Sequence, residues 1–183
     1  MKKRLASKVD GFYEIGESAL PLYWWAEPHP PERLTAWLTA RRMRRECDVR
    51  FPIRTGRFQG DAVSFSVWSE RIVNTLKETG ASGWSSLPAR VSRNGKSIKG
   101  YHLIHVSGRG GSLDTKRSRA FTDASGLLRH EGVFMVESEW DGSDLFLIPE
   151  LGTMIFATER VALALRNAKL RNFSVTPAAD VWG

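Results

Sequence analysis

The residues that could carry out chemistry in this 183-residue chain are few and far apart. Of the four histidines, His102 and His105 lie three positions apart in a strand-like run, so their side chains point to opposite faces of a sheet. The sequence contains neither H-E-x-x-H nor an H-x-E pattern with a later C-x-x-C, the spacings that hold a catalytic zinc ion. We therefore expect no metal site.

Nucleophilic catalysis is not indicated by the sequence either. Cys47 is the only cysteine, which rules out an intrachain disulfide and a cysteine-rich metal site. It is flanked by Glu46 and Asp48 as well as by arginines, so nothing nearby in the sequence marks an activated thiolate. No G-x-S-x-G elbow marks a nucleophilic serine. We interpret Cys47 as a structural residue.

A glycine-rich run follows the strand-like segment that contains the two histidines. Residues 107–112 read S-G-R-G-G-S, and their backbone amides could bind a phosphate. A P-loop, however, continues with Lys-Ser or Lys-Thr at the start of a helix, and neither pair follows here. A G-x-G-x-x-G unit for a dinucleotide is absent as well. We therefore favour a flexible connection over an anion-binding loop, and we expect no cofactor.

Four carboxylates are close together in the sequence between residues 137 and 144. Glu137 and Glu139 share one face of an expected strand, and Asp141 and Asp144 follow it. Paired carboxylates can act as general acid and base in a cleft. Beside a tight hairpin they more often form a charged edge that prevents pairing with other strands, and we favour this structural role. With no catalytic residue indicated, the chain is not expected to be an enzyme.

The clearest chemical signal is a formal net charge of +7, with a sequence pI near 9.9. Such an excess favours acidic partners, which are nucleic acids or acidic protein surfaces. The alternative is a solvated surface, and arginines at the end of a helix would also complement its dipole. For partner binding we select two basic clusters: Arg41, Arg42, Arg44 and Arg45 in the first, and Arg109, Lys116, Arg117 and Arg119 in the second.

The elements that must position these residues fit one α+β domain over residues 1–183. We expect a mixed, largely antiparallel sheet with helices packed against it. Residues 1–60 contribute short strands and a helix from Pro31 to about Glu46, and residues 61–178 form the main body. No run approaches the roughly 18 apolar residues of a membrane span, and no apolar segment follows the basic start of the chain. We expect a cytoplasmic protein that does not contact a membrane.

Two glycine-containing turns predict β-hairpins in the main body. Asn94-Gly95 and Asp141-Gly142 each separate two strand-like runs, which is a strong short-range hairpin signal. These runs cover residues 84–92 and 97–106 around the first turn, and residues 133–140 and 144–148 around the second. The polar, glycine-rich stretch from residue 107 to residue 124 is predicted to be a long surface loop.

Two stretches of the chain are similar to each other at a constant offset of 89 residues. Residues 65–88 and 154–177 align without a gap. In each, a strand leads to a hydroxyl cap (Ser69 or Thr158), a helix with one apolar side, a second strand and a proline. The alternative is chance similarity between two amphipathic β-α-β units. We favour an internal duplication of the β-α-β unit.

Seven short runs carry a likeness to a known family: Ser69-Glu-Arg-Ile-Val-Asn-Thr-Leu, Leu87-Pro-Ala-Arg-Val, Gly100-Tyr-His-Leu-Ile-His-Val, Leu113-Asp-Thr-Lys-Arg-Ser, Phe146-Leu-Ile-Pro, Met154-Ile-Phe-Ala-Thr-Glu-Arg-Val and Phe173-Ser-Val-Thr-Pro. They resemble predicted bacterial immunity proteins of polymorphic-toxin and type VI secretion systems, typified by a myxobacterial member. The resemblance covers roughly residues 60–178. Its motifs are mostly apolar framework, caps and turns.

This resemblance implies a protein that binds and neutralises a cognate toxin or effector by stoichiometric inhibition, without a catalytic residue of its own. Inhibitors of nucleases are frequently acidic, so the charge of +7 implies a route other than mimicry of nucleic acid. The residues leave one alternative open, a nucleic-acid-binding protein in which Trp24 and Trp25 stack on bases while arginines contact phosphates. No recognised nucleic-acid-binding module supports that alternative.

Overall fold

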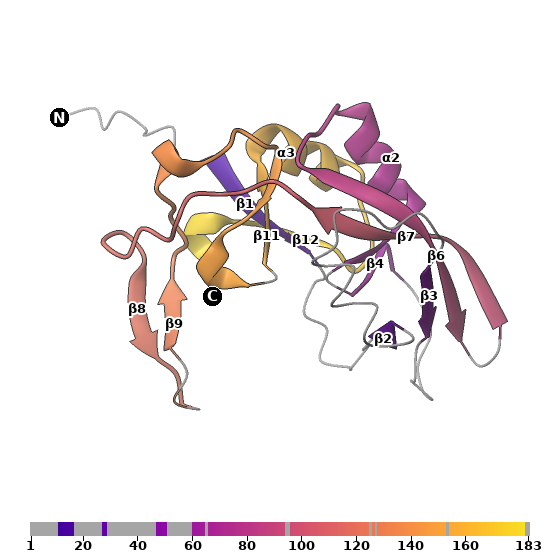
Figure 1. Ribbon diagram of the computed structural model, residues 1–183, viewed down its shortest axis with the longest axis horizontal. Coiled ribbons are helices and arrows are strands. Elements are labelled where there is room, and N and C mark those ends of the chain that lie inside the picture. The colour runs from indigo at the N-terminus through magenta and orange to yellow at the C-terminus, as the bar shows by residue number, and fades with distance from the viewer. Residues whose placement is uncertain are drawn as a thin grey trace.

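The protein is described by a computed structural model over residues 11–16, 27–28, 47–50, 60–64, 66–93, 96–124, 126, 128–152 and 154–181. Over these residues the chain is an α+β protein with two α-helices and mostly antiparallel strands (Figure 1). This confirms the fold class expected from the sequence.

The described strands form two main sheets and a separate hairpin. The first sheet is antiparallel, in the order β10 (Leu145–Leu147), β11 (Ile155–Thr158), β1 (Phe12–Gly16) and β12 (Ser174–Pro177). The second has the order β2 (Glu27–Pro28), β3 (Cys47–Arg50), β6 (Trp84–Arg93), β7 (Lys96–Val106), β5 (Val67–Ser69) and β4 (Ala62–Ser64), with β3 and β6 parallel. The hairpin pairs β8 (Arg119–Thr122) with β9 (Leu128–Glu131).

The helices α2 (Glu70–Glu78) and α3 (Glu159–Asn167) contact each other and share one hydrophobic core. Ile72 and Leu76 of α2 and Val161 and Leu165 of α3 are fully buried in it, together with Trp68 of β5. Figure 1 shows the two helices lying next to each other above the sheets. Because both helices bury their apolar sides in the same core, each sheet-and-helix half completes the core of the other.

A second hydrophobic core lies around β10 and β11. Phe146 and Phe156 are fully buried there, with stacked rings whose centroids are 6.0 Å apart. Val133 and Met135, from the segment that follows β9, are buried against them. This packing attaches the base of the β8–β9 hairpin to the body of the protein.

The cap and first-hairpin predictions are confirmed. Ser69 is the N-cap of α2 and Thr79 is its C-cap, and Thr158 is the N-cap of α3. Neither hydroxyl oxygen accepts a hydrogen bond from an amide of its own helix; each hydroxyl donates to an aspartate instead. β6 and β7 form the hairpin predicted around residues 94–95.

The second predicted hairpin is wrong. Residues 137–139 form a 3-10 helix where a strand over 133–140 was expected. The start of that segment pairs with the glycine-rich run instead, since Val136 N donates to Ser112 O at 2.9 Å and Asp114 N donates to Phe134 O at 2.8 Å. A hairpin does form nearby, but it pairs β8 with β9. β8 lies within residues 107–124, where a long loop was expected.

The two stretches predicted to be repeats form equivalent units, β5–α2–β6 and β11–α3–β12. Their buried helix positions match at the offset of 89: Ile72, Val73 and Leu76 correspond to Val161, Ala162 and Leu165. The turns after the helices match as well. Gly80 and Gly83 have φ values of 62° and 81°, and their counterparts Lys169 and Asn172 have values of 48° and 54°. The repeat in backbone conformation supports the predicted duplication.

Asp61 joins the first unit to the second. Its carboxylate accepts hydrogen bonds from Ser69 Oγ at 2.6 Å and from Arg71 Nη1 at 2.9 Å, both in the first unit. It also accepts the backbone N–H of Arg171, after α3, at 2.8 Å. Arg71 Nη2 donates to the carbonyl oxygen of Ala168, the C-cap residue of α3, at 2.8 Å. The arginine of one unit therefore binds the helix terminus of the other.

Asp144 makes the same connections in the reverse direction. Its carboxylate accepts hydrogen bonds from Thr158 Oγ1 at 2.9 Å and from Arg160 Nη2 at 2.8 Å. It also accepts the backbone N–H of Ser82, after α2, at 3.0 Å. Arg160 Nη1 donates to the carbonyl oxygen of Thr79, the C-cap residue of α2. We refer to Arg71–Asp61 and Arg160–Asp144 as the two arginine clamps.

The close approach of the units predicts a strong effect of Gly83→Ala. Gly83 has a positive φ, and a Cβ atom there would overlap the carbonyl oxygen of Leu145 and lie 2.6 Å from Ser143 Cβ. We expect the substitution to lower the free energy of unfolding by about 2–4 kcal/mol in urea titrations, from backbone strain plus overpacking. Gly80→Ala is the control, because Gly80 also has a positive φ but nothing lies within 4 Å of its Cβ position. It should lose only about 1 kcal/mol. Equal losses for both would contradict the close contact.

Candidate functional site

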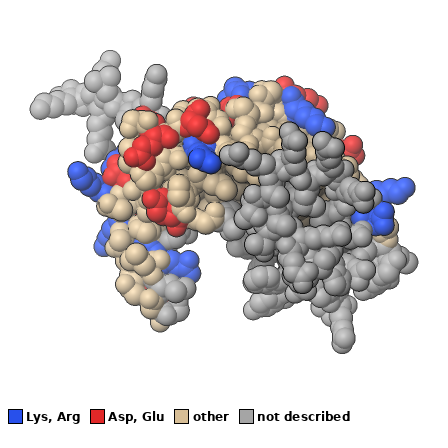
Figure 2. All heavy atoms as spheres, in the orientation of Figure 1, with Lys and Arg blue, Asp and Glu red and all other residues tan. Residues whose placement is uncertain are grey.

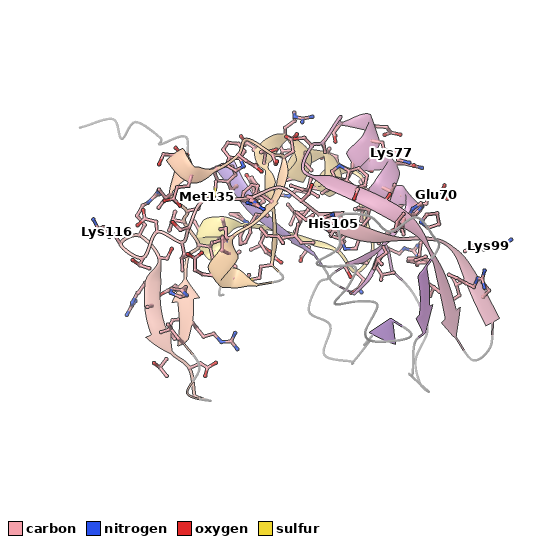
Figure 3. The ribbon with its side chains drawn as sticks, in the orientation of Figure 1. Glu70, Lys77, Lys99, His105, Lys116 and Met135 are labelled. Carbon is pink, nitrogen blue, oxygen red and sulfur yellow. The ribbon has the colours of Figure 1, made fainter. Side chains whose placement is uncertain are left out.

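The second predicted basic cluster falls into two places in the structure. Arg109 lies in the glycine-rich run, where its backbone N–H donates to Asp141 Oδ2 at 2.8 Å. Lys116, Arg117 and Arg119 lie at the start of the β8–β9 hairpin, and Lys116 projects away from the body (Figure 3). The structure therefore does not bring all four together. The first predicted cluster lies outside the described residues: Arg41, Arg42, Arg44 and Arg45.

The glycine-rich run, residues 107–113, is an ordered segment that we call the glycine strap. Most of its backbone amides donate hydrogen bonds to groups of the same chain. Gly110 N donates to Leu147 O at 2.9 Å, and Ser112 N donates to Glu139 Oε2 at 2.8 Å. Leu113 N donates to Glu150 Oε2 at 3.1 Å. The expectation of a flexible connection is wrong, and the amides that could have bound a phosphate already bind carboxylates and carbonyls.

The carboxylates of Glu139 and Asp141 have a structural role, but it is not the predicted one of a charged strand edge. Glu139 does not lie on a strand edge; it holds the strap, and hydrogen bonds from the Ser112 hydroxyl and amide lower the pKa of its carboxyl group. Burial alone would raise the pKa of Asp141, but hydrogen bonds from Ser143 and from the Arg109 amide lower it overall. Both groups are held in the ionised form, as acceptors rather than as a general acid.

The β8–β9 hairpin projects from the body (Figure 1). Its charges are partly paired: Arg119 Nη1 lies 3.3 Å from Glu131 Oε2, and Arg129 Nε lies 2.9 Å from Asp123 Oδ2. The guanidinium of Arg117 lies 4.1 Å from the centroid of the Phe134 ring at the base of the hairpin. Exposed pairs of this kind contribute little to stability, so the hairpin depends on its base for support.

A groove of about 680 Å³ lies between the hairpin and the body. Leu128, Arg129 and His130 line it from β9. Leu113, Leu151 and Met154 line it from the body. Leu128 has 66% of its surface exposed, which is the largest value among the described large apolar residues. The groove therefore combines an exposed apolar anchor with an apolar wall.

Sequence reasoning missed this groove because it placed no strand at residues 119–131. A signal was present. Residues 123–126 read D-A-S-G, and Gly126 N donates to Asp123 O at 3.0 Å, as in a common β-turn with Asp first and Gly fourth. The strands beside this turn are mostly polar and exposed, so no apolar alternation marked them.

The net charge is not carried by the described residues. The chain has 27 Lys and Arg against 20 Asp and Glu, and 11 of the former and four of the latter lie outside the described ranges. The described part is therefore balanced, with 16 of each kind. Figure 2 shows basic atoms on the hairpin and acidic atoms on the body above it. On the face shown in Figure 2, basic and acidic side chains are therefore separated although the described part has no net charge.

One histidine with a buried ring nitrogen could have suggested chemistry. His102 Nδ1 and Trp68 Nε1 are buried without a hydrogen-bond partner, and the two residues lie opposite each other on β7 and β5. Burial lowers the pKa of His102, partly offset by the charge of Glu70, so its imidazole is held neutral. In the part of the chain that the structure describes, no three His, Cys, Asp or Glu side chains are grouped so that they could hold a metal ion. His102 and Trp68 are therefore interpreted as a structural cross-strand pair.

None of the helices within the described ranges is both long and apolar enough to span a membrane.

Comparisons of the sequence with known proteins leave the function open. No protein-family model matches the chain, and no curated protein matches it. The resemblance to immunity proteins therefore stays a prediction that depends on the framework runs quoted above.

The strap contacts predict a local effect of removing Glu139. In Glu139→Ala, we expect the amide proton of Ser112 to exchange at least tenfold faster, because it loses its acceptor. Glu137→Ala is the control, since Glu137 is an exposed neighbour on the same 3-10 helix. Amide hydrogen exchange followed by NMR measures both. Equal exchange of Ser112 in the two variants would contradict the role of Glu139.

The same contacts predict a pH dependence. The pKa values of Glu139 and Asp141 are lower in the folded protein than their ordinary values, so the stabilisation they provide is present above about pH 4–5. It is lost as the pH falls through the lowered values. Protection of the strap amides should therefore decrease on acidification below about pH 4 in the wild type. In the double variant Glu139→Gln/Asp141→Asn, the decrease over this range should be much smaller.

Proposed function

We propose that this chain is an immunity-type inhibitor, which binds a cognate toxin stoichiometrically and blocks it without a reaction of its own. The observation that carries the proposal is the groove between the β8–β9 hairpin and the body. It places the exposed Leu128 of a projecting element beside the apolar side chains of the body, and together they offer a protein partner apolar surface to bury.

The chemistry of the groove indicates the kind of protein surface that would bind. Leu113, Leu151 and Met154 form a wall that accommodates an apolar side chain of the partner. The charged lining is Arg129 and His130 on the hairpin side and Glu150 on the body side, so acidic residues of the partner would be favoured next to the hairpin. We propose Leu128 as the central contact and the basic residues Lys116, Arg117 and Arg119 as the surrounding contacts.

The construction of the hairpin also suits a binding element. A two-stranded hairpin is marginal alone, but here its base is attached to a buried core. A binding loop on a firmly packed scaffold loses less conformational freedom when a partner binds. The glycine strap, which contains Arg109, is held to the body in the same way by Glu139 and Asp141.

Nucleic-acid binding remains the second candidate, favoured by the net charge of +7. The described surface is electrically balanced, so this function would depend on the basic residues outside the described ranges. Its affinity would fall steeply with salt because phosphate contacts release counterions. Binding of a protein through the groove would depend on salt far less.

A prediction for Leu128 tests the groove directly. A tagged copy of the chain, used on nuclease-treated lysate of its own cells, provides the candidate toxin. We expect the purified pair to form a 1:1 complex, and Leu128→Asp to weaken it by about 30-fold or more. Leu163→Asp is the matched control, since Leu163 is also an exposed leucine, with 42% of its surface exposed, but lies on α3. Isothermal titration calorimetry measures both.

The captured protein must also behave as a toxin. Its expression alone should stop growth of a heterologous host, and co-expression of the wild-type chain should restore growth while the Leu128→Asp variant does not. A partner that is harmless, or one bound equally by both leucine variants, would contradict the proposal. Retention of nuclease-sensitive material alone, in a parallel capture from untreated lysate, would favour nucleic-acid binding.

The basic residues of the second cluster predict an effect on association. Reversal of Lys116, Arg117 and Arg119 to glutamate should slow association with the captured partner by about tenfold at low salt, with a smaller effect at high salt. Reversal of Lys77, Lys99 and Lys169, which are exposed on other elements, is the control. Stopped-flow or surface plasmon resonance measurements give the rates. If the two triple variants associate equally fast, the assignment of this cluster is wrong.

A further inference from the structure

The repeat relation extends to the strand at the centre of each main sheet. β1 lies between β11 and β12, and β7 lies between β5 and β6. Phe12, Tyr13 and Glu14 of β1 lie opposite Thr158, Ala157 and Phe156, while Tyr101, His102 and Leu103 of β7 lie opposite Ser69, Trp68 and Val67. Each residue in one set is 89 positions from its counterpart in the other. β1 is therefore the counterpart of β7 in register as well as in place.

The other side of each central strand gives the same offset. Gly16, Ile15, Glu14 and Tyr13 lie opposite Ser174, Val175, Thr176 and Pro177, while His105, Ile104, Leu103 and His102 lie opposite Ser85, Ser86, Leu87 and Pro88. The sequences are related too, since Gly11-Phe-Tyr-Glu-Ile corresponds to Gly100-Tyr-His-Leu-Ile. The strand registers on both sides and the sequences themselves therefore give the same offset of 89 between β1 and β7.

We infer that the chain consists of two tandem copies of one unit, residues 11–88 and 100–177, which have exchanged their first strands. By sequence order β1 belongs to the first copy, but it completes the sheet of the second. β7 belongs to the second copy and completes the sheet of the first. This is the arrangement of a strand-swapped dimer whose two subunits are fused into one chain. The surface that each copy uses to bind the other is therefore a surface that binds a second copy of the same unit. The inference does not depend on the proposed function.

The short junction between the copies explains the exchange. β6 ends at Arg93 and β7 begins at Lys96, so two residues connect them. A connection of this length makes the two strands antiparallel neighbours. The first strand of the second copy therefore takes the place beside β6 that β1 would fill in a closed single unit. β1 is left to fill the equivalent place in the second copy.

The two central strands are adapted to their exchanged places. Leu103 of β7 is 1% exposed and lies opposite the buried Val67. Its counterpart in β1 is Glu14, which is only partly buried where it lies, opposite Phe156. Burial already raises the pKa of Glu14 there, and the place of Leu103 would bury the carboxylate more completely. This difference opposes a closed arrangement in which β1 lies between β5 and β6.

Two cysteine pairs in the full chain distinguish the exchanged arrangement from the closed one. With Cys47→Ala as background, Glu14→Cys/Thr176→Cys places the two cysteines opposite each other in the exchanged arrangement. Glu14→Cys/Leu87→Cys would do so in the closed one, because Leu87 is the counterpart of Thr176. Under mild oxidation we expect the first pair to form an intramolecular disulfide in most molecules and the second in few, by mass spectrometry of the alkylated monomer. The reverse result would overturn the inference.

A cut at the junction tests the mutual dependence of the copies. A protease site is inserted between Arg93 and Lys96, and the folded chain is cleaved there. We expect both pieces to elute together in size-exclusion chromatography and to separate only in denaturant, because each holds the central strand of the other. Pieces that separate into folded monomers in native buffer would contradict the exchange. The same chain with a scrambled site, treated with the protease, is the control.

Discussion

Arg71 and Arg160 each bind two groups that would otherwise be poorly satisfied. One is an aspartate of the arginine's own unit, and the other is a carbonyl oxygen at the end of the other unit's helix. The arginine side chains are more than half exposed, whereas the side chains of Asp61 and Asp144 are 8% and 16% exposed. Coulomb attraction alone is therefore weakened by solvent. The contribution of the clamps lies in satisfying partly buried carboxylates and unpaired helix carbonyls.

The remaining structure follows from this reciprocal contact. The clamps fix α2 beside α3, and this position lets both helices bury their apolar sides in one core. The same two aspartates accept hydrogen bonds from the amides of Ser82, before β6, and Arg171, before β12, which sets the sheets against each other. Removal of one clamp would therefore loosen both copies, since each arginine belongs to one and binds the end of the other.

The two copies differ in sequence and in length between the central strand and the clamp aspartate. In the first copy this segment runs from residue 17 to residue 60, and in the second it runs from residue 107 to residue 143. The second segment holds the strap and the β8–β9 hairpin, with Leu128 and the basic residues at the start of the hairpin, and it forms one side of the groove. The two copies thus share a frame that provides stability, while the segments in which they differ are available for recognition of a partner.

The sequence was informative where the interactions are local. Caps, helix stripes and the two-residue turn at residues 94–95 act over a few residues, and they predicted α2, α3 and the β6–β7 hairpin. The offset of 89 also exposed the repeat. The strap was misread because Ser112 and Glu139 are far apart in sequence, and no local pattern shows that a carboxylate will bind those amides. β1 and β7 share too few identical residues to reveal their relation without the sheet registers.

Native-state amide hydrogen exchange of the free protein tests most directly whether the copies form one frame. The account predicts that the slowest amides of α2 and α3 open with the same free energy, and that Arg71→Met lowers both by the same amount. The β8–β9 amides should open separately and at lower free energy, as expected for an element attached at its base. If Arg71→Met loosened α2 and left α3 unchanged, the reciprocal frame would be contradicted.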